Sequence, residues 1–208
     1  VCHHLVREGT RPIVTINIFP LVRHTGGMAA KYEDGVHFVV TPQQSVPARY
    51  LDPKAKTRSR LHYKVAELQA SHMEKGAQAL LTDEHGFITE GTGNNFFMVR
   101  QGELLTPTPR DILRGVSRGV CLELAAKLGL KARETDIEPY DVRQADEAWF
   151  TSTTICMVPI TRFNFQPMGK GRPGLLYRRL LDAWSAEVGV DIPGQARQYA
   201  ELAKTWKP

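Results

Sequence analysis

Hydrophobic residues along this chain alternate with polar ones in short runs and recur at helical spacing in a few longer runs. Strict alternation and short apolar runs are typical of β-strands. Clusters of Gly, Asp and Asn between several of these runs indicate tight turns, as in a meander. Strands are therefore predicted over residues 11–21, 36–40, 77–82, 87–90, 96–100, 103–106, 132–137, 147–151 and 155–161.

Helical spacing appears in stretches that contain few Gly or Pro residues. Between residues 59 and 75 apolar positions recur at intervals of three and four, which predicts an amphipathic helix that ends at Gly76. A second helix is predicted over residues 116–128, and others over 140–145 and 174–188, whereas 25–35 and 41–53 are expected to be irregular. The predicted apolar faces are Leu61, Val65, Leu68 and His72 in the first helix, and Val120, Leu124 and Leu128 in the second.

The order of these elements, without internal repeats, favours an α/β or mixed α+β domain built on a mixed sheet. A chain of 208 residues with 42% hydrophobic content can bury a sizeable core. It contains no apolar run that could span a bilayer and no secretory leader at its start, so a soluble, cytoplasmic protein without membrane partners is expected.

Cysteine usage and charge narrow the function classes further. The three cysteines, Cys2, Cys121 and Cys156, fit neither a disulfide framework nor a zinc site, and no second ligand pair follows Cys2-His3-His4, so no metal is expected. The net charge of +5 comes from scattered Lys and Arg residues. Nucleic-acid binders instead cluster their basic residues, so attraction of small anions such as phosphates and carboxylates is the favoured interpretation.

Four polar features stand out as candidate chemistry. Glu90 lies where a predicted strand meets a Gly-Thr-Gly turn, a position that suits either an exposed hairpin acid or a buried functional one. Lys56 precedes the first predicted helix, and residues 115–117 and 152–154 form two turns rich in small and hydroxyl residues. Such turns can bind phosphate through N–H and hydroxyl groups, although a serine at a helix start is also an ordinary N-cap. Together these features suggest a phosphorylated cofactor with a ring nitrogen.

Four sequence blocks occur in a recognisable order: DPKAKTRSRLHY, TEGTGNNFFMVRQGELLTP, LRGVSR and ADEAWFTSTTICMVPI. They resemble the fold-type IV (class IV) pyridoxal-phosphate aminotransferases, which include branched-chain aminotransferases, D-amino acid aminotransferases and aminodeoxychorismate lyases. The resemblance runs from about Tyr32 to Trp184. It implies a D-amino acid aminotransferase-like fold, with a large cofactor-binding domain over residues 32–208 and residues 1–31 as a remnant of, or linker from, a small N-terminal domain.

The resemblance also implies roles for individual residues toward pyridoxal 5'-phosphate. Lys56 falls where the family has the lysine that forms a Schiff base with the cofactor, and Lys54 is the alternative if the register shifts by two. Glu90 falls on the carboxylate that pairs with the pyridine nitrogen and keeps it protonated. The remaining implied contacts are Leu113 on the ring face, Val116 and Ser117 at the phosphate, and Thr153 and Thr154 at the phosphate or the substrate carboxylate.

Two departures from the family pattern concern the substrate pocket and the start of the chain. Residues 57–63 replace the Gly-Gly-Asn-Tyr run of branched-chain enzymes. Within this segment, Arg58 and Arg60 either bind a substrate carboxylate or are solvated. Tyr63 belongs either to the core or to the edge of the site. No block matching the family's phosphate-binding arginine precedes Arg11, so the small domain is expected to be largely absent.

The implied function is an aminotransferase that exchanges an amino group between an amino acid and a 2-oxo acid. Branched-chain substrates are favoured over D-amino acids or amines, and the resemblance implies a homodimer. Two alternatives remain open: a lyase of the aminodeoxychorismate type, and a non-catalytic scaffold that has lost the cofactor.

Overall fold

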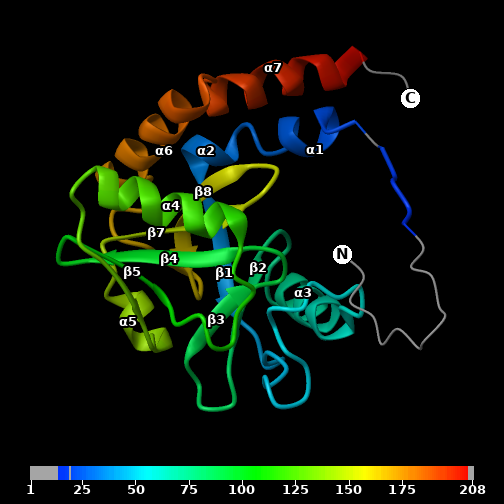
Figure 1. The fold of residues 1–208 in the computed structure, drawn as a ribbon, viewed down its shortest axis with the longest axis vertical. Helices are drawn as coiled ribbons and strands as arrows, with labels where there is room; N and C mark the ends of the chain where they lie inside the picture. Colours follow the sequence, from blue (N-terminus) through cyan, green and yellow to red (C-terminus); the bar gives the residue numbers. More distant parts are fainter. Residues whose placement is uncertain (1–13, 19, 206–208) are drawn as a thin grey trace.

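The computed structural model describes residues 14–18 and 20–205. Within these residues a mixed sheet of nine strands forms the centre of the molecule (Figure 1). The strands are β1 (Val36–Val40), β2 (Gln78–Thr82), β3 (Ile88–Gly91), β4 (Asn95–Arg100), β5 (Glu103–Pro107), β6 (Ala132–Thr135), β7 (Glu147–Ser152), β8 (Cys156–Phe163) and β9 (Gln166–Pro167).

The strand order is β3-β2-β1-β8-β7-β4-β5-β6, and β9 pairs with β8. β1 runs parallel to β2 and β8, and β5 runs parallel to β6, whereas the other neighbours are antiparallel. β4 also pairs with β3 through Asn95 and Glu90, which closes β3, β2, β1, β8, β7 and β4 into a ring. The predicted mixed sheet is confirmed, and Glu90 lies at the point where this ring closes.

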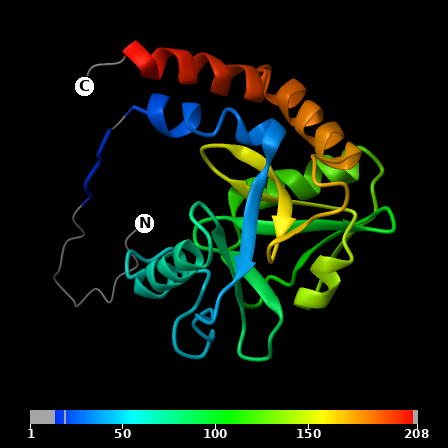
Figure 2. The same ribbon diagram turned by 180° about the vertical axis from the view of Figure 1, so that it is seen from behind.

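Helices cover the outside of the sheet. Their bounds are α1 (Val22–Gly26), α2 (Lys31–Asp34), α3 (Leu61–Met73), α4 (Val116–Lys127), α5 (Pro139–Arg143), α6 (Leu175–Val188) and α7 (Ile192–Thr205). α1 lies along α7 in both views (Figure 1 and Figure 2). α4 and α6 contact each other and β7, whereas α3 packs against β2. None of the described helices is long and apolar enough to cross a membrane.

The hydrophobic core has a large and a small part. The large part contains Phe97 and Trp149 from neighbouring strands, whose rings stack with centroids 6.0 Å apart, and Tyr177 from α6 packs against Trp149. The small part lies under α3, where Ala66 and Ala70 meet residues of β1 and β2. These apolar contacts hold the strands whose ends carry the candidate site.

Most predicted elements agree with the structure to within a few residues, but the strand predicted over residues 11–21 is wrong. Its described part, residues 14–18 and 20–21, forms no strand, and Ile18 is 95% exposed. Its remaining positions lie outside the described residues, as do Cys2, His3 and His4. α1 and α2 lie where a loop was predicted; at Gly26 an added Cβ would lie 2.7 Å from the backbone of Tyr199 and Ala200, so close packing on α7 accompanies α1.

The helix predicted over residues 59–75 is confirmed as α3, but its predicted apolar face is wrong. Leu61 and Leu68 are 75% and 61% exposed, whereas Ala66 and Ala70 are fully buried. Small side chains allow the helix backbone to lie close to the sheet, so the alanine face is inward and the larger leucines face outward. The helix ends at Met73, before Gly76. α7 follows the last predicted helix and was not predicted.

Candidate active site

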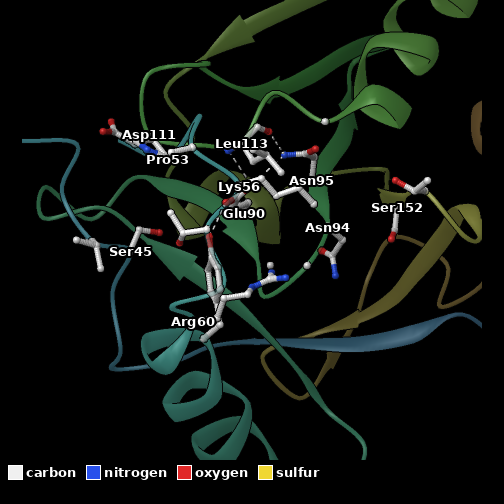
Figure 3. Close-up of a pocket in the computed structure, with 18 of the residues that line it drawn as sticks. Ser45, Pro53, Lys56, Arg60, Glu90, Asn94, Asn95, Asp111, Leu113 and Ser152 are labelled. Atoms are coloured by element: carbon white, nitrogen blue, oxygen red, sulfur yellow. Dashed lines mark hydrogen bonds between the residues drawn. The ribbon is translucent and has the colours of Figure 1, made fainter. Parts of the chain in front are cut away.

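A cavity of about 580 Å³ opens between the loop before α3, the β3–β4 hairpin, the start of α4 and the β7–β8 turn (Figure 3). These segments are far apart in the sequence and meet at one end of the closed ring of strands. Every residue for which a cofactor contact was predicted lies in its lining: Lys56, Glu90, Leu113, Val116, Ser117, Thr153 and Thr154.

Glu90 is a buried acid in the wall of this cavity. It is 5% exposed, which excludes the alternative of an ordinary exposed hairpin acid. The hydroxyl of Tyr63 donates a 2.8 Å hydrogen bond to Glu90 Oε1. The side-chain amide of Asn95 and the backbone N–H of Leu113 donate to Glu90 Oε2 at 3.0 and 3.1 Å. Both carboxylate oxygens are therefore held by donors from three different segments.

The charge state of Glu90 reflects opposing effects. The pKa of its carboxyl group is raised to about 7, because burial desolvates the charged form by more than the other contacts offset. The hydrogen bonds from Tyr63 and Leu113 and the positive charges of Arg60 and Lys56 lower that pKa, in this order of importance. The carboxyl group is thus poised near neutral pH, in a cavity where a cationic partner would favour its ionised form.

Asn95 links the β3–β4 hairpin to the loop before α4. Its amide nitrogen donates to Leu113 O at 2.8 Å as well as to Glu90. An added Cβ at Gly115 would lie 2.2 Å from Asn95 Oδ1, so glycine permits this close approach. Asn95 was assigned no role from the sequence, whereas Tyr63 was left open between the core and the edge of the site and lies in the cavity lining. For Asn95 a signal existed, because a two-strand hairpin places it directly opposite Glu90.

Lys56 and its alternative, Lys54, occupy different surroundings. Lys56 lies in the loop before α3, lines the cavity, and its charge acts on Glu90. Lys54 is outside the cavity lining; its Nζ donates to Arg110 O and lies 3.6 Å from Asp52 Oδ1. Of the two lysines, the structure brings only Lys56 into the wall of the cavity.

The two candidate arginines, Arg58 and Arg60, also differ in their position relative to the cavity. Arg60 lines the cavity, donates a 2.6 Å hydrogen bond to Thr92 O, and lies with its Cζ 4.9 Å from the centroid of the Tyr63 ring. Within the described part of the chain, no carboxylate forms an ion pair with it. Arg58 is exposed and lies outside the lining. Arg60 therefore brings to the cavity a positive charge that forms no ion pair with a described carboxylate but acts on Glu90, whereas Arg58 lies outside the lining.

Two backbone turns supply hydrogen-bond donors. α4 begins after Gly115, which forms no side-chain cap, so the first N–H groups of the helix are available at the cavity beside Ser117. Near the end of β7 the buried hydroxyl of Thr151 has no hydrogen-bond partner among the described residues, and in the β7–β8 turn Thr154 Oγ1 lies 2.8 Å from His24 Nε2. The contact from α1 to Thr154 has no signal in the sequence.

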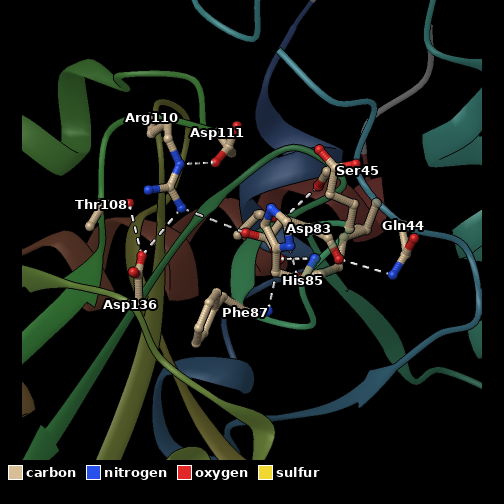
Figure 4. A network of polar contacts seen from close by, with 12 residues as sticks. Gln44, Ser45, Asp83, His85, Phe87, Thr108, Arg110, Asp111 and Asp136 are labelled. Carbon is tan, nitrogen blue, oxygen red and sulfur yellow. Dashed lines mark hydrogen bonds and ion pairs between the residues drawn. The ribbon is translucent and has the colours of Figure 1, made fainter. Parts of the chain in front are cut away.

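Arg110, in the loop that also carries Leu113, takes part in a network of polar contacts (Figure 4). Arg110 forms ion pairs with Asp111 at 2.6 Å, with Asp136 at 3.4 Å and with Asp83 at 3.7 Å. Asp83 in turn accepts backbone hydrogen bonds within the β2–β3 turn. The network ties this loop to two other segments of the chain. No cluster of His, Cys, Asp and Glu among the described residues could hold a metal ion.

Comparison with known proteins gives consistent relatives. A model of the family described as amino-transferase class IV matches residues 19–163. A branched-chain-amino-acid aminotransferase of Pseudomonas aeruginosa is 32% identical over 131 residues, which are 63% of this chain and 43% of that protein. A D-alanine aminotransferase of Bacillus licheniformis is 29% identical over 181 residues, which are 86% of this chain and 60% of that protein.

Solved structures agree. A branched-chain amino acid aminotransferase from Thermobaculum terrenum, crystallised in its PLP-form, superposes with a TM-score of 0.70 at 27% identity over 80% of this chain and 53% of its own. The D-amino acid aminotransferase-like fold expected from the resemblance is therefore confirmed. The chain spans about half the length of the relatives it matches.

Proposed function

This chain belongs to the amino-transferase class IV family, and we propose that it forms the pyridoxal-5'-phosphate-binding part of an aminotransferase. The reaction would exchange an amino group between an amino acid and a 2-oxo acid. The observation that carries the proposal is the buried Glu90 carboxylate, which shares one cavity with the Lys56 amine and the start of α4.

The residues of the cavity fit this cofactor. A buried carboxylate suits a protonated ring nitrogen, and a helix start without a side-chain cap suits a phosphate. Thr151, in the same lining, adds a buried hydroxyl that has no hydrogen-bond partner within the described part of the chain. When bound, pyridoxal phosphate supplies an electron sink for the negative charge that develops on the substrate Cα.

Glu90 and Leu113 would orient and tune the pyridine ring. The ionised Glu90 carboxylate would hold a proton on the ring nitrogen, and the three hydrogen bonds that it accepts keep its oxygens in place. The Leu113 side chain would pack on one face of the ring while its backbone N–H remains bonded to Glu90. Asn95 and the Arg110 network would maintain this arrangement from outside the ring.

Lys56 would act twice. Its Nζ would hold the cofactor through a covalent bond, and as a free amine it would be the base that takes the proton from the substrate Cα. Its position in the cavity wall, with its charge acting on Glu90, supports this role. Lys54 is held by Arg110 and Asp52 instead.

The phosphate and the substrate would be held at the two hydroxyl-rich turns. Val116 and Ser117 would bind the phosphate through the N–H groups of the helix start and the Ser117 hydroxyl. Thr153 and Thr154 would bind the phosphate or the substrate carboxylate through backbone and hydroxyl groups. Arg60, which lines the cavity and forms no ion pair with a described carboxylate, is the second candidate for the carboxylate.

Branched-chain amino acids are the favoured substrates. The names of the relatives support this choice, and Val46, Leu51 and Pro53 give part of the cavity an apolar wall that suits an aliphatic side chain. D-amino acids are the second candidate, because the match to the D-alanine aminotransferase covers 86% of the chain. A cofactor-binding domain over residues 32–208, a homodimer and a cytoplasmic location also belong to this proposal.

The test combines cofactor trapping with an amino-donor panel. The purified protein is incubated with pyridoxal phosphate, reduced with borohydride and mapped by mass spectrometry; we expect a pyridoxyl adduct on Lys56. L- and D-amino acids are then offered with one 2-oxo acid acceptor, and amino transfer from L-branched-chain donors is expected. Transfer from D-donors would favour the second candidate, and pyruvate release without an acceptor would indicate a lyase. A protein that binds no cofactor would overturn the proposal.

A further inference from the structure

Tyr63 lies between a buried acid and a partly buried arginine in the cavity wall. It belongs to the first turn of α3 and lines the cavity together with Arg60 and Glu90. Its hydroxyl donates to Glu90 Oε1 at 2.8 Å, and the guanidinium Cζ of Arg60 lies 4.9 Å from the centroid of its ring. Tyr63 thus contacts a positive charge with its ring and a carboxylate with its hydroxyl.

The two oxygens of Glu90 are held in different ways. Oε2 accepts from Asn95 and from the Leu113 backbone, which belong to β4 and to the loop before α4. Oε1 accepts from Tyr63, the one donor to it that is found among the described residues. Loss of the Tyr63 hydroxyl would therefore leave a buried carboxylate oxygen without its donor, while the bonds to the other oxygen remain.

The Tyr63 hydroxyl is suited to be a permanent donor. Burial, together with the neighbouring Glu90 charge, raises the pKa of Tyr63 far above its ordinary value, so the phenol keeps its proton. A hydrogen bond donated to a carboxylate stabilises the ionised form over the neutral form. Burial is the largest influence on the pKa of Glu90, which lies at about 7, and the Tyr63 hydrogen bond is the largest influence that lowers it, so this donor affects how much of the group is ionised at neutral pH.

We propose that Tyr63 is a positioning residue that favours the ionised form of Glu90 and fixes the orientation of its carboxylate toward the cavity. This inference rests on the proposed function, in which an ionised Glu90 faces a protonated pyridine nitrogen. The charged and titratable groups that act on Glu90 are Lys56 and Arg60 from the loop before α3, and Tyr63 from α3 itself. β4 and the loop before α4 contribute the neutral donors Asn95 and Leu113.

The test is the titration of Glu90 in protein without cofactor. The carboxyl band of Glu90 is identified by infrared difference spectroscopy as the band that is lost in Glu90→Gln, and its intensity is followed with pH. Tyr63→Phe keeps the ring and removes the hydroxyl. We expect the midpoint for Glu90 to rise by about one pH unit, the equivalent of one hydrogen bond to a charged group. An unchanged or lowered midpoint would overturn the inference.

Two further variants complete the experiment. Tyr140→Phe removes an exposed hydroxyl on α5 and should leave the midpoint unchanged. Tyr63→Leu replaces Tyr63→Phe if the latter does not unfold cooperatively, and the same rise is expected. Because the midpoint is measured without cofactor, this experiment tests the role of Tyr63 separately from the proposed function. Failure to bind pyridoxal phosphate would overturn the proposed function, whereas a constant midpoint would overturn the role of Tyr63 alone.

Discussion

Asn95 faces Glu90 across the β3–β4 pairing and donates a 3.0 Å hydrogen bond to its Oε2. The same pairing closes the ring of strands, so Glu90 is positioned by the sheet and not by a surface loop. Because Asn95 also donates to Leu113 O, the sheet, the acid and the loop before α4 form one connected unit. Changes to any member of this unit should affect both stability and cofactor binding.

A substitution at Gly115, directly before α4, tests the connection between Asn95, Glu90 and Leu113. In Gly115→Ala the new methyl group would lie 2.2 Å from Asn95 Oδ1, so the Asn95 amide must move and weaken its bonds to Glu90 and Leu113. We expect the free energy of unfolding to fall by about 1–3 kcal/mol, measured by urea denaturation. Cofactor retention should fall as well.

Gly119 supplies the matched control in the same helix. An added Cβ there would meet nothing within 4 Å, and Gly119 lies inside α4. Because alanine favours a helix interior over glycine, Gly119→Ala should raise the free energy of unfolding by about 0.5–1 kcal/mol. Equal effects of the two substitutions would contradict the packing of Gly115 against Asn95.

Alanine substitutions of the two lysines in the loop before α3 are expected to have opposite effects on cofactor attachment and amino transfer. Lys56→Ala should abolish the borohydride-trapped pyridoxyl adduct and amino transfer, because it removes the amine in the cavity wall. Lys54→Ala should keep both, since Lys54 is bonded to Arg110 O outside the lining. Mass mapping after reduction distinguishes them, and an adduct that persists in Lys56→Ala would refute the assignment.

Ser117 should contribute to cofactor retention and not to the chemical step. Its side chain is at the start of α4, is 8% exposed and lines the cavity. Ser117→Ala should weaken pyridoxal phosphate binding by about 1 kcal/mol, roughly a fivefold higher Kd, because one hydrogen bond is lost. Equilibrium dialysis measures this change, and Ser71→Ala at an exposed position of α3 should leave Kd unchanged.

Local patterns predicted strands such as β1, β4 and β7 well because these strands place runs of apolar residues in the core. Hairpins such as β4–β5 also carry their turn signal in the sequence, at Gln101 and Gly102. α3 shows the limit of this reasoning. Its apolar periodicity predicted a helix correctly, but which face is inward depended on how closely the backbone approaches β1 and β2, and that favoured Ala66 and Ala70.

The candidate site could be predicted where a family motif or a turn marks it, as at Glu90 and Ser117. Tyr63 could not be assigned in this way, because its partner Glu90 is 27 positions away and reaches it only after the sheet has formed. The contact of His24 with Thr154 spans 130 positions and depends on α1. The packing of α1 against α7 is not predicted by any local sequence pattern. Long-range contacts of this kind require the tertiary structure.

The raised pKa of Glu90 makes the stability of the protein depend on pH in an unusual direction for an acid. Burial raises this pKa from 4.5 to about 7, so between these values the folded protein holds a proton that the unfolded chain has lost. The contribution of Glu90 to the free energy of unfolding is therefore most favourable below about pH 4.5, declines as pH rises, and levels off above about pH 7. A shift of this size corresponds to roughly 3 kcal/mol.

Glu90→Gln removes this titration while keeping a similar shape. Urea unfolding of both proteins without cofactor, between pH 4 and 8, should show the wild-type free energy of unfolding falling relative to the variant by up to about 3 kcal/mol. Glu123→Gln, at an exposed position of α4, should follow the wild-type curve. A constant difference between wild type and Glu90→Gln across this range would show that Glu90 titrates alike in the folded and unfolded chains. Such a result would contradict the raised pKa of the buried Glu90 carboxyl group.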